Sequence, residues 1–381
     1  MNIVIDIRPL IHAKISGVTV YISNLSLQLL RTDKHNKYYF YYNSFSGLEF
    51  EKKAFKKFKM IGTRYPNKFF NLCLSLLRWP KLDKLVAKKI GKNIDAFVVL
   101  DPRPAPVSKN CSKITVFHDL SFERYPNNFS LKTRLWHKIL RPKKEALSSD
   151  KIIAVSEFTK NELINYYKAP EEKFDVIYHG VSRKFQKIEN AQRLEEIREK
   201  YSLKKKFILT ISTIEPRKNL QTLIKAVEKL NEKHEENDYE LIIAGLKNPK
   251  IFKTPVLTEK SFVKFLGYVP LSDKLLLYNA AECYCCASFY EGFGFPILEA
   301  MKCGCPVVTS RAGSLSEIAG EENALFIDPY DINDITNALE VAILRGREDE
   351  RVEKAREYAR GFSWRKCAMK TVKVISERSA I

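Results

Sequence analysis

Short apolar runs alternate with longer amphipathic segments over almost the whole chain. The runs are bounded by turn-forming residues, which is typical of buried strands, and the segments between them carry apolar residues at helical spacing. In the first half, the predicted strands are residues 3–5, 38–41, 96–100, 114–117, 151–155 and 174–178. In the second half, they are residues 207–212, 240–245, 263–267, 281–286, 306–309 and 324–327. Strands that alternate with helices predict parallel sheets and an α/β fold.

The two series of strands are separated by a polar stretch from about Ser182 to Lys206, which holds one charged helix candidate. At 381 residues, the chain also exceeds what one hydrophobic core usually serves. We therefore predict two doubly wound domains, residues 1–181 and residues 182–360. Because such sheets bind ligands at the carboxyl ends of their strands, we expect the functional site in a cleft between the two domains.

The composition excludes a disordered chain and narrows the choice of partners. Hydrophobic residues make up 45% of the chain and aromatic residues 12%, which is enough to form buried cores. The formal net charge of +20 favours an anionic partner, either nucleic acid, acidic lipid headgroups or a phosphate-bearing substrate. No apolar run has the length needed to span a bilayer, and the first residues lack the pattern of a signal peptide. These features predict a cytoplasmic protein.

The eight cysteines include close clusters at residues 283–286 and 303–305. Their neighbours are apolar, strand-like residues rather than histidines or turn glycines. This pattern favours reduced, buried thiols over the alternative of a zinc site. We therefore expect no metal.

The strongest motif is the segment from Tyr290 to Met301, in which a strand-like run ends, Gly292 and Gly294 form a loop, and an apolar helix follows. A helix amino end with free N–H groups suits a phosphate, and glycines let the backbone approach it closely. The alternative is an ordinary strand–loop–helix connection whose glutamate compensates the helix dipole.

Two glutamates flank this loop. If the helix begins early, Glu291 and Glu299 lie on one face of it, about two turns apart. Carboxylates at these positions are suited to accept hydrogen bonds from hydroxyl groups, such as those of a hexose and a ribose. A phosphate flanked by two polyols describes a nucleotide sugar.

This segment, together with residues 304–308, resembles the signature of the large retaining family of GT-B nucleotide-sugar glycosyltransferases (family 4-like). The two glutamates, separated by seven residues, match that family's motif. Further matching segments follow the family's order along nearly the whole chain, at residues 117–120, 155–159, 213–220, 266–269 and 362–364. The resemblance implies a GT-B fold, with two Rossmann-like domains that face a central cleft. It also implies a C-terminal helix, residues 361–381, that packs back on the N-terminal domain.

The resemblance assigns catalytic roles to four residues. Arg217 and Lys218 follow a strand end, where a pair of cations can neutralise a diphosphate leaving group. His118 also follows a strand, and family members place a histidine of this motif against the donor sugar. Glu291 is expected at the donor hexose. Without the resemblance, a solvated basic turn and a structural histidine are the alternatives.

The resemblance also implies a donor-binding set. Its members are Gly17, Arg217, Lys218, Gly267, Tyr268, Val269, Glu291, Gly292, Phe293, Gly294, Phe295, Leu298 and Glu299. Residues 267–269 fall where the family holds the nucleobase, and Glu299 is expected at the ribose. Residues 16–19 resemble the family's N-terminal glycine loop, although many members have a second glycine where Thr19 stands.

By the same resemblance, the reaction proceeds with retention, through front-face departure of the nucleoside diphosphate, without a metal or a cofactor. The expected donor is GDP-mannose, and the expected acceptor is a lipid-linked saccharide in bacterial O-antigen or other surface-polysaccharide synthesis. The alternatives are a UDP-hexose-dependent transferase, a related GT-B epimerase of UDP-N-acetylglucosamine, and a non-catalytic nucleotide-sugar or membrane-binding module. A dehydrogenase is disfavoured because no strand is followed by three spaced glycines.

A basic and aromatic segment, residues 52–92, contains many Lys and Arg residues but only Asp83 as an acid. Its first cations are Lys52, Lys53, Lys56 and Lys57. This composition predicts peripheral binding to an anionic membrane surface, at the inner face of the cytoplasmic membrane. The alternative is a solvated helix pair whose apolar face packs in the core. Nucleic acid is not expected as a partner, because the basic residues form no known binding motif.

Overall fold

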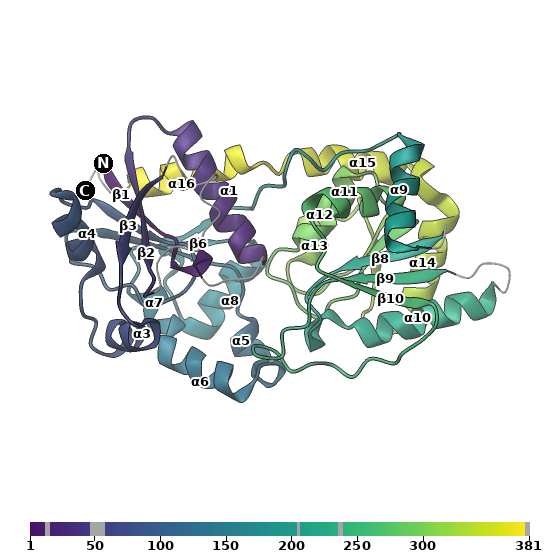
Figure 1. Cartoon of the computed structure of the whole chain (residues 1–381), viewed down its shortest axis with the longest axis horizontal. Helices are drawn as coiled ribbons and strands as arrows, with labels where there is room; N and C mark the ends of the chain where they lie inside the picture. The colour runs from purple at the N-terminus through teal and green to yellow at the C-terminus, as the bar shows by residue number, and fades with distance from the viewer. Residues whose placement is uncertain (12–15, 46–57, 204–205, 235–238, 378–381) are drawn as a thin grey trace. The chain divides into compact units, whose positions relative to one another are not determined.

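The computed structural model describes residues 1–11, 16–45, 58–203, 206–234 and 239–377. The chain folds into two compact units (Figure 1). The first unit comprises residues 1–120, 134–180 and 364–381, and the second unit comprises residues 121–133 and 181–363.

The first unit is built on a seven-stranded sheet in which every neighbouring pair of strands is parallel, in the order β3-β2-β1-β4-β5-β6-β7. The strands are β1 (Asn2–Asp6), β2 (Lys37–Asn43), β3 (Lys59–Thr63), β4 (Ala96–Val99), β5 (Ser112–Phe117), β6 (Lys151–Ala154) and β7 (Phe174–Val176). The hydrophobic pattern predicts all of them except β3. This edge strand is mostly half-buried and contains a lysine and a glycine, so it has no continuous apolar run.

The main helices of the first unit are α1 (Gly17–Thr32), α3 (Asn67–Leu76), α4 (Leu82–Ile90), α7 (Pro142–Leu147), α8 (Glu157–Tyr167) and α16 (Trp364–Glu377). The helix α6 (Leu131–Leu140) begins in the second unit and ends in the first. Helix α16 is the last element among the described residues and packs against α1 (Figure 1). The predicted return of the C-terminal helix to the first domain is therefore confirmed.

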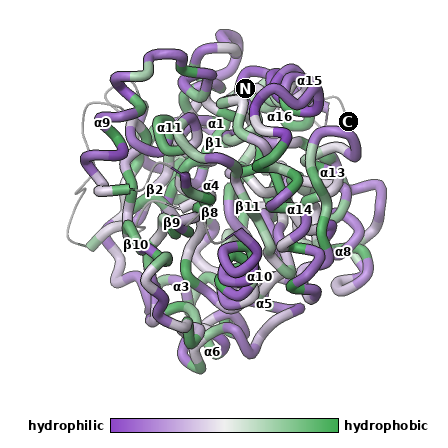
Figure 2. The backbone as a smooth tube through the Cα atoms, turned by 90° about the vertical axis from the view of Figure 1, so that its right-hand side faces the viewer, coloured by the Kyte–Doolittle hydropathy of each residue, from purple (hydrophilic) through white to green (hydrophobic). Residues whose placement is uncertain are grey.

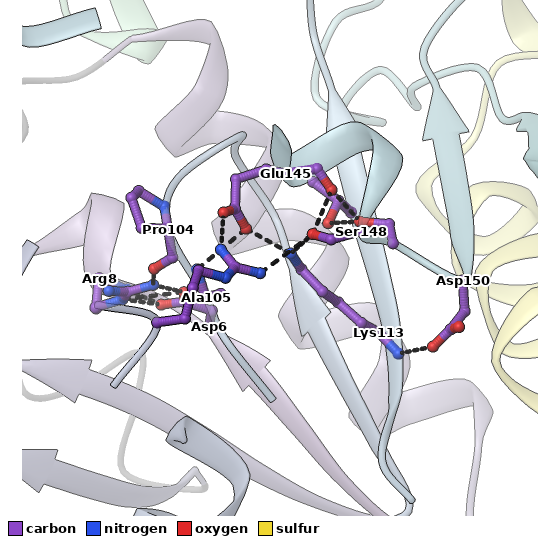
Figure 3. A network of polar contacts seen from close by, with 11 residues as sticks. Asp6, Arg8, Pro104, Ala105, Lys113, Glu145, Ser148 and Asp150 are labelled. Atoms are coloured by element: carbon purple, nitrogen blue, oxygen red, sulfur yellow. Dashed lines mark hydrogen bonds and ion pairs between the residues drawn. The ribbon is translucent and has the colours of Figure 1, made fainter. Parts of the chain in front are cut away.

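A buried polar network ties the sheet of the first unit to its loops (Figure 3). Lys113 Nζ on β5 forms an ion pair with Glu145 on α7, and both side chains are almost fully buried. Glu145 Oε2 also accepts a hydrogen bond from Ala105 N over 3.2 Å. At the end of β1, Arg8 Nη2 pairs with Asp6 Oδ2 over 2.6 Å. Buried charges of this kind are stable only when paired, so the network fixes the loops at the carboxyl ends of β1 and β4.

The second unit contains a six-stranded parallel sheet in the order β10-β9-β8-β11-β12-β13. The strands are β8 (Phe207–Ile211), β9 (Glu240–Ala244), β10 (Val263–Gly267), β11 (Cys283–Cys286), β12 (Val307–Ser310) and β13 (Leu325–Ile327). The hydrophobic pattern predicts each of them. The doubly wound α/β architecture predicted for both halves is confirmed.

The main helices of the second unit are α9 (Ala191–Tyr201), α10 (Leu220–Lys233), α11 (Leu271–Ala280), α12 (Phe295–Lys302), α13 (Leu315–Ala319), α14 (Ile332–Arg345) and α15 (Glu350–Arg360). Helices α10 and α14 contact each other and bury their apolar faces against the sheet. The hydrophilic stretches of α9 and α15 are visible in Figure 2. The apolar faces of the amphipathic helices α10 and α14 therefore form a hydrophobic core with the sheet.

Buried cysteines contribute to these cores. All eight thiols are free, and all except the half-buried Cys73 are buried. Burial raises the pKa of the Cys283 and Cys303 thiols, so both remain protonated at neutral pH. In the described ranges, no group of three or more His, Cys, Asp or Glu side chains is placed to hold a metal ion.

The segment 121–133 lies in the second unit, whereas the sequence places it within the first domain. Phe129 pairs with Phe252 through an isolated antiparallel bridge and a ring contact of 5.1 Å between centroids. Ser130 N donates a hydrogen bond to Ile251 O over 2.9 Å. The hydrophobic pattern does not indicate this pairing, because it joins irregular loops that are far apart in the sequence.

Candidate functional site

Strand β8 leads into a turn that carries two cations. The 3-10 turn η4 (Pro216–Lys218) begins with a proline, whose φ is pre-set for a helical turn, and is followed by Asn219 with a left-handed φ of 56°. This turn places Arg217 and Lys218 beyond the carboxyl end of β8. Because β8 is a central strand between β9 and β11, the two cations lie at the edge of the sheet where parallel α/β sheets bind ligands.

Both cations bind the carboxylate of Glu291. Arg217 Nη1 donates hydrogen bonds to Glu291 Oε2 and to Tyr290 O, each over 2.8 Å. Lys218 Nζ pairs with Glu291 Oε1, which also accepts a hydrogen bond from Ser288 Oγ over 3.0 Å. The three charged side chains are nearly buried, with 10–13% of their surface exposed. Glu291 therefore belongs to a preformed charge cluster within the second unit.

The cations determine the ionisation of Glu291. Burial acts to raise the pKa of this carboxyl, but the Lys218 and Arg217 charges outweigh burial and lower the pKa to about 2. Glu291 is therefore ionised at neutral pH. An ionised carboxylate only accepts hydrogen bonds, so it is suited to hydroxyl groups and not to phosphate oxygens.

The loop after β12 holds the backbone of Glu291. Ser314 N and Ser314 Oγ both donate hydrogen bonds to Glu291 O, over 3.0 and 3.1 Å. Gly313 has a φ of +67°, and a Cβ atom at this position would lie 2.4 Å from the same oxygen. Only glycine therefore allows the loop to approach Glu291 this closely.

The helix after the glycine loop begins later than the two-glutamate hypothesis requires. Helix α12 starts at Phe295, and its N-cap Gly294 has a left-handed φ of 94°. Glu291 thus lies in the loop before the helix, so the expectation that Glu291 and Glu299 share a helix face is wrong. Pro296 stands in the first turn of α12, as its fixed φ favours.

Glu299 is held by its own partners on α11. Its Oε2 accepts a hydrogen bond from Tyr278 OH over 3.0 Å and pairs with Lys274. Only 9% of the side chain is exposed. The Phe293 and Leu298 side chains are buried in the core, with 5% and 0% exposed. The Phe293 and Leu298 side chains therefore support the loop through packing.

The segment predicted to hold the nucleobase, residues 267–269, begins at the last residue of the edge strand β10. Gly267 has a φ of 66°, and its carbonyl oxygen accepts a hydrogen bond from Gly245 N over 2.7 Å. Gly245 itself packs so tightly that a Cβ atom would overlap Ser212 O. Tyr268 is 49% exposed and Val269 is half-buried. The exposed Tyr268 ring suits stacking on a planar base.

The N-terminal glycine loop becomes the first turn of helix α1. Ser16 is the N-cap, and Thr19 completes a capping box: Ser16 N donates to Thr19 Oγ1 over 2.8 Å, and Thr19 N donates to Ser16 Oγ over 3.3 Å. Gly17 is the exposed first residue of the helix. The threonine that departs from the family's glycine therefore has a structural role as a cap.

His118 lies in the first unit, directly after β5. Its Nε2 is 2.9 Å from Leu100 O, and a carbonyl oxygen can only accept, so Nε2 carries the proton and Nδ1 is the acceptor. The ring packs edge-on against Tyr21, with 4.9 Å between centroids, and lies 5.5 Å from the ring of His179. Burial lowers the pKa of His118, so its imidazole is neutral at neutral pH.

Comparisons with known proteins assign a family to this arrangement. The model described as "Glycosyltransferase Family 4" matches residues 15–185, and the model described as "Glycosyl transferases group 1" matches residues 193–362. The O-antigen chain mannosyltransferase B of Escherichia coli is 34% identical over 277 residues, which are 68% of this chain and 68% of the relative. The chain is a member of the GT-B glycosyltransferases.

Two further similarities extend this result. The serotype-specific mannosyltransferase WbdA of Escherichia coli is 31% identical over 241 residues, which are 60% of this chain but only 29% of the relative. This glycosyltransferase thus matches less than a third of that relative's length. The crystal structure of the Anabaena protein HepE in complex with UDP-glucose has a TM-score of 0.70, with 18% identity, and covers 99% of both chains. This likeness supports the GT-B fold.

The glycosyltransferase structure brings together part of the predicted site. Arg217, Lys218 and Glu291 form one cluster, and residues 267–269 and Glu299 lie elsewhere in the same unit. His118 and Gly17 belong to the first unit.

Sequence reasoning did not identify Glu215, Ser288, Gly313 or Ser314. A glycine soon after the predicted strand 306–309 is the only sequence signal for the loop that supports Glu291. Glu215 lies within a segment that matches the family, but the sequence does not show its ion pair.

Proposed function

We propose that the chain is a retaining, metal-independent hexosyltransferase that moves mannose from GDP-mannose onto a lipid-linked saccharide in O-antigen or other bacterial surface-polysaccharide synthesis. The charge cluster of Arg217, Lys218 and Glu291 is the observation that carries this proposal. The names of the two Escherichia coli relatives support mannose as the sugar and a surface polysaccharide as the product.

The cluster suits both ends of a nucleotide sugar. Negative charge grows on the diphosphate as the glycosidic bond breaks, and Arg217 and Lys218 stabilise it there. When the cations engage phosphate oxygens, the oxygens of Glu291 become available to accept hydrogen bonds from the hexose hydroxyls. In the first unit, Nδ1 of neutral His118 offers a further acceptor for a hydroxyl group of the donor sugar.

A donor screen tests this proposal. We expect the purified protein to bind GDP-mannose more tightly than UDP-glucose, UDP-galactose and UDP-N-acetylglucosamine, as measured by calorimetry in the presence of EDTA. Product analysis with a lipid-linked acceptor then distinguishes transfer from epimerisation. Tighter binding of a UDP-hexose would contradict GDP-mannose as the donor. It would favour the alternative of a UDP-hexose-dependent transferase, in line with the UDP-glucose complex of the Anabaena protein. Donor binding without turnover on any lipid acceptor would favour the binding module.

We also propose that the protein acts at the inner face of the cytoplasmic membrane, bound peripherally through the first unit. Among the described residues, no helix has the length and hydrophobicity needed to cross a membrane. Helix α3 buries Phe70 and Leu74 in the core, but exposes Phe69 (65%) on its other side. Leu77 and Trp79 directly after the helix are exposed by 70% and 67%.

Cations accompany these apolar side chains. The exposed basic residues that the structure describes in this part of the chain are Lys59, Arg64, Lys68, Lys84, Lys88, Lys89 and Lys92. Lys52, Lys53, Lys56 and Lys57 lie outside the described residues. Apolar side chains beside cations suit an anionic lipid surface, where each nearby cation contributes about 1 kcal/mol. The alternative of a helix with its apolar face in the core accounts for Phe70 and Leu74, but not for the exposed side chains.

Liposome flotation tests the membrane surface. We expect binding to vesicles that contain anionic lipid, loss of this binding at high salt, and at least a tenfold weaker affinity in the Phe69→Ser/Leu77→Ser/Trp79→Ser variant. The control is Leu344→Ser, which removes an equally exposed leucine (76%) from the second unit and leaves binding unchanged. Equal flotation of the wild type and the triple variant would contradict the proposal.

A further inference from the structure

Glu215 is a buried carboxylate beside the donor cations to which the proposed reaction gives no role. It stands two residues before Arg217 and is 1% exposed. Its Oε1 pairs with Arg217 Nη2 over 2.9 Å. Its Oε2 is buried and has no hydrogen-bond partner among the described residues. An ionised oxygen in such a place is costly, so this carboxylate depends on Arg217 for its charge balance.

Arg217 bridges two carboxylates. Its Nη2 faces Glu215, whereas its Nη1 faces Glu291. With Lys218, the cluster contains as many cations as carboxylates. The charged groups that act on Glu215 are Arg217 and Lys218 of the same turn and Glu291 of the loop after β11.

The two carboxylates differ in how readily they accept a proton. Burial raises the pKa of Glu215 despite the Arg217 and Lys218 cations, and the negative charge of Glu291 raises it further. The same cations lower the pKa of Glu291 to about 2, against the effect of burial. A surplus of negative charge in this cluster is therefore relieved first by protonation of Glu215.

Donor binding creates such a surplus. Each phosphoryl group of a nucleotide sugar is ionised at neutral pH, and the proposed function places this diphosphate against Arg217 and Lys218. We propose that Glu215 is a positioning residue that takes up one proton from solvent when the nucleotide sugar binds, and returns it when the nucleoside diphosphate leaves. The neutral acid keeps its hydrogen bond with Arg217 through its carbonyl oxygen and leaves the full charge of Arg217 to the phosphates. This inference rests on the proposed donor site.

Proton uptake makes donor affinity depend on pH. Below the pKa of Glu215 in the free protein, the carboxyl is protonated with and without donor, so affinity is constant and highest. Above its pKa in the complex, the carboxyl is ionised in both states, so affinity is constant and lowest. Between these limits, affinity falls up to about tenfold per pH unit as pH rises.

Isothermal titration calorimetry tests this coupling. GDP-mannose and UDP-glucose are titrated into the wild type from about pH 5 to about pH 8, without acceptor, in pairs of buffers that differ in ionisation enthalpy. We expect uptake of up to one proton per bound donor in the wild type. Glu215→Gln, which keeps the shape and cannot ionise, binds donor with no proton uptake and with an affinity that does not change with pH. Glu282→Gln, a half-buried glutamate just before β11, is the matched control and behaves as the wild type.

The outcomes separate this inference from the proposed function. If neither nucleotide sugar binds the wild type, both fail. If a donor binds without proton uptake, or if Glu215→Gln takes up the same proton, only the role of Glu215 is overturned. Infrared difference spectra of the wild type give a check that does not depend on the folding of the variant: donor binding produces a band of a protonated carboxylic acid, and the absence of this band contradicts the proposal.

Discussion

Replacing Arg217 with alanine lowers kcat about 10²–10³-fold, because one side chain serves both the leaving group and Glu291. In the free protein, Arg217 Nη1 binds Glu291 and the backbone of Tyr290. With donor bound, the same guanidinium stabilises the charge that develops on the diphosphate. The lost interaction is strongest in the transition state, so we expect the change mainly in kcat and less in KM.

Stability must be separated from catalysis in this variant, because the substitution leaves Glu215 buried without its cation. Loss of one partner of a buried pair costs about 3–5 kcal/mol. The double variant Arg217→Ala/Glu215→Gln removes this unpaired charge, so it regains thermal stability but not kcat.

Arg217→Lys keeps the positive charge but lacks the planar guanidinium group, so its kcat falls between those of Arg217→Ala and the wild type. Arg311→Ala, which breaks an exposed pair with Glu321, is the control and retains full activity. An unimpaired kcat in Arg217→Ala would contradict the proposed role.

Much of the fold could be predicted because parallel strands are buried on both faces. Segment 96–100 is a continuous apolar run, segment 240–245 is apolar after its first residue Glu240, and the structure buries every residue of β4 and β9. The hydrophobic pattern does not predict the edge strand β3, because most of its residues are only half-buried and form no continuous apolar run. Segment 121–133 was placed in the wrong half because short loop pairings leave no periodic signal.

The candidate site could be predicted in part. Glycine, proline and charged residues close together in the sequence indicated the turns that carry Arg217 and Glu291. The residues that hold Glu291 from a distance could not be found in this way. Ser314 reaches Glu291 because the loops that carry them follow β12 and β11, which are neighbours in the sheet. The order of strands in a sheet cannot be read from the hydrophobic pattern. The early helix start that would put Glu291 and Glu299 on one face does not occur, because the left-handed φ of Gly294 keeps the loop non-helical up to the residue before Phe295.

Glu291→Ala is expected to lower kcat/KM by at least about 10²-fold. The substitution removes the acceptor for the hexose hydroxyls and leaves Lys218 without the partner that positions it. Glu291→Gln keeps the size of the side chain but replaces one acceptor oxygen with a donor, so it recovers only a small part of the activity. Steady-state kinetics with the donor selected by the screen give kcat/KM for both variants. Full donor consumption by Glu291→Ala would exclude this carboxylate from the reaction.

The pH dependence of stability gives a second, independent test of the same carboxylate. Its pKa lies at about 2 in the folded protein, below the ordinary value of 4.5, so the folded state favours the ionised form. Glu291 therefore stabilises the fold above pH 4.5, and this contribution is lost as pH falls from 4.5 towards 2. We expect the thermal stability of the wild type to fall more steeply over this range than that of Glu291→Gln. Because the carboxyl stays ionised at neutral pH, any titration of donor binding above pH 4.5 must come from another group, and Glu215 is the buried carboxyl that faces the same guanidinium.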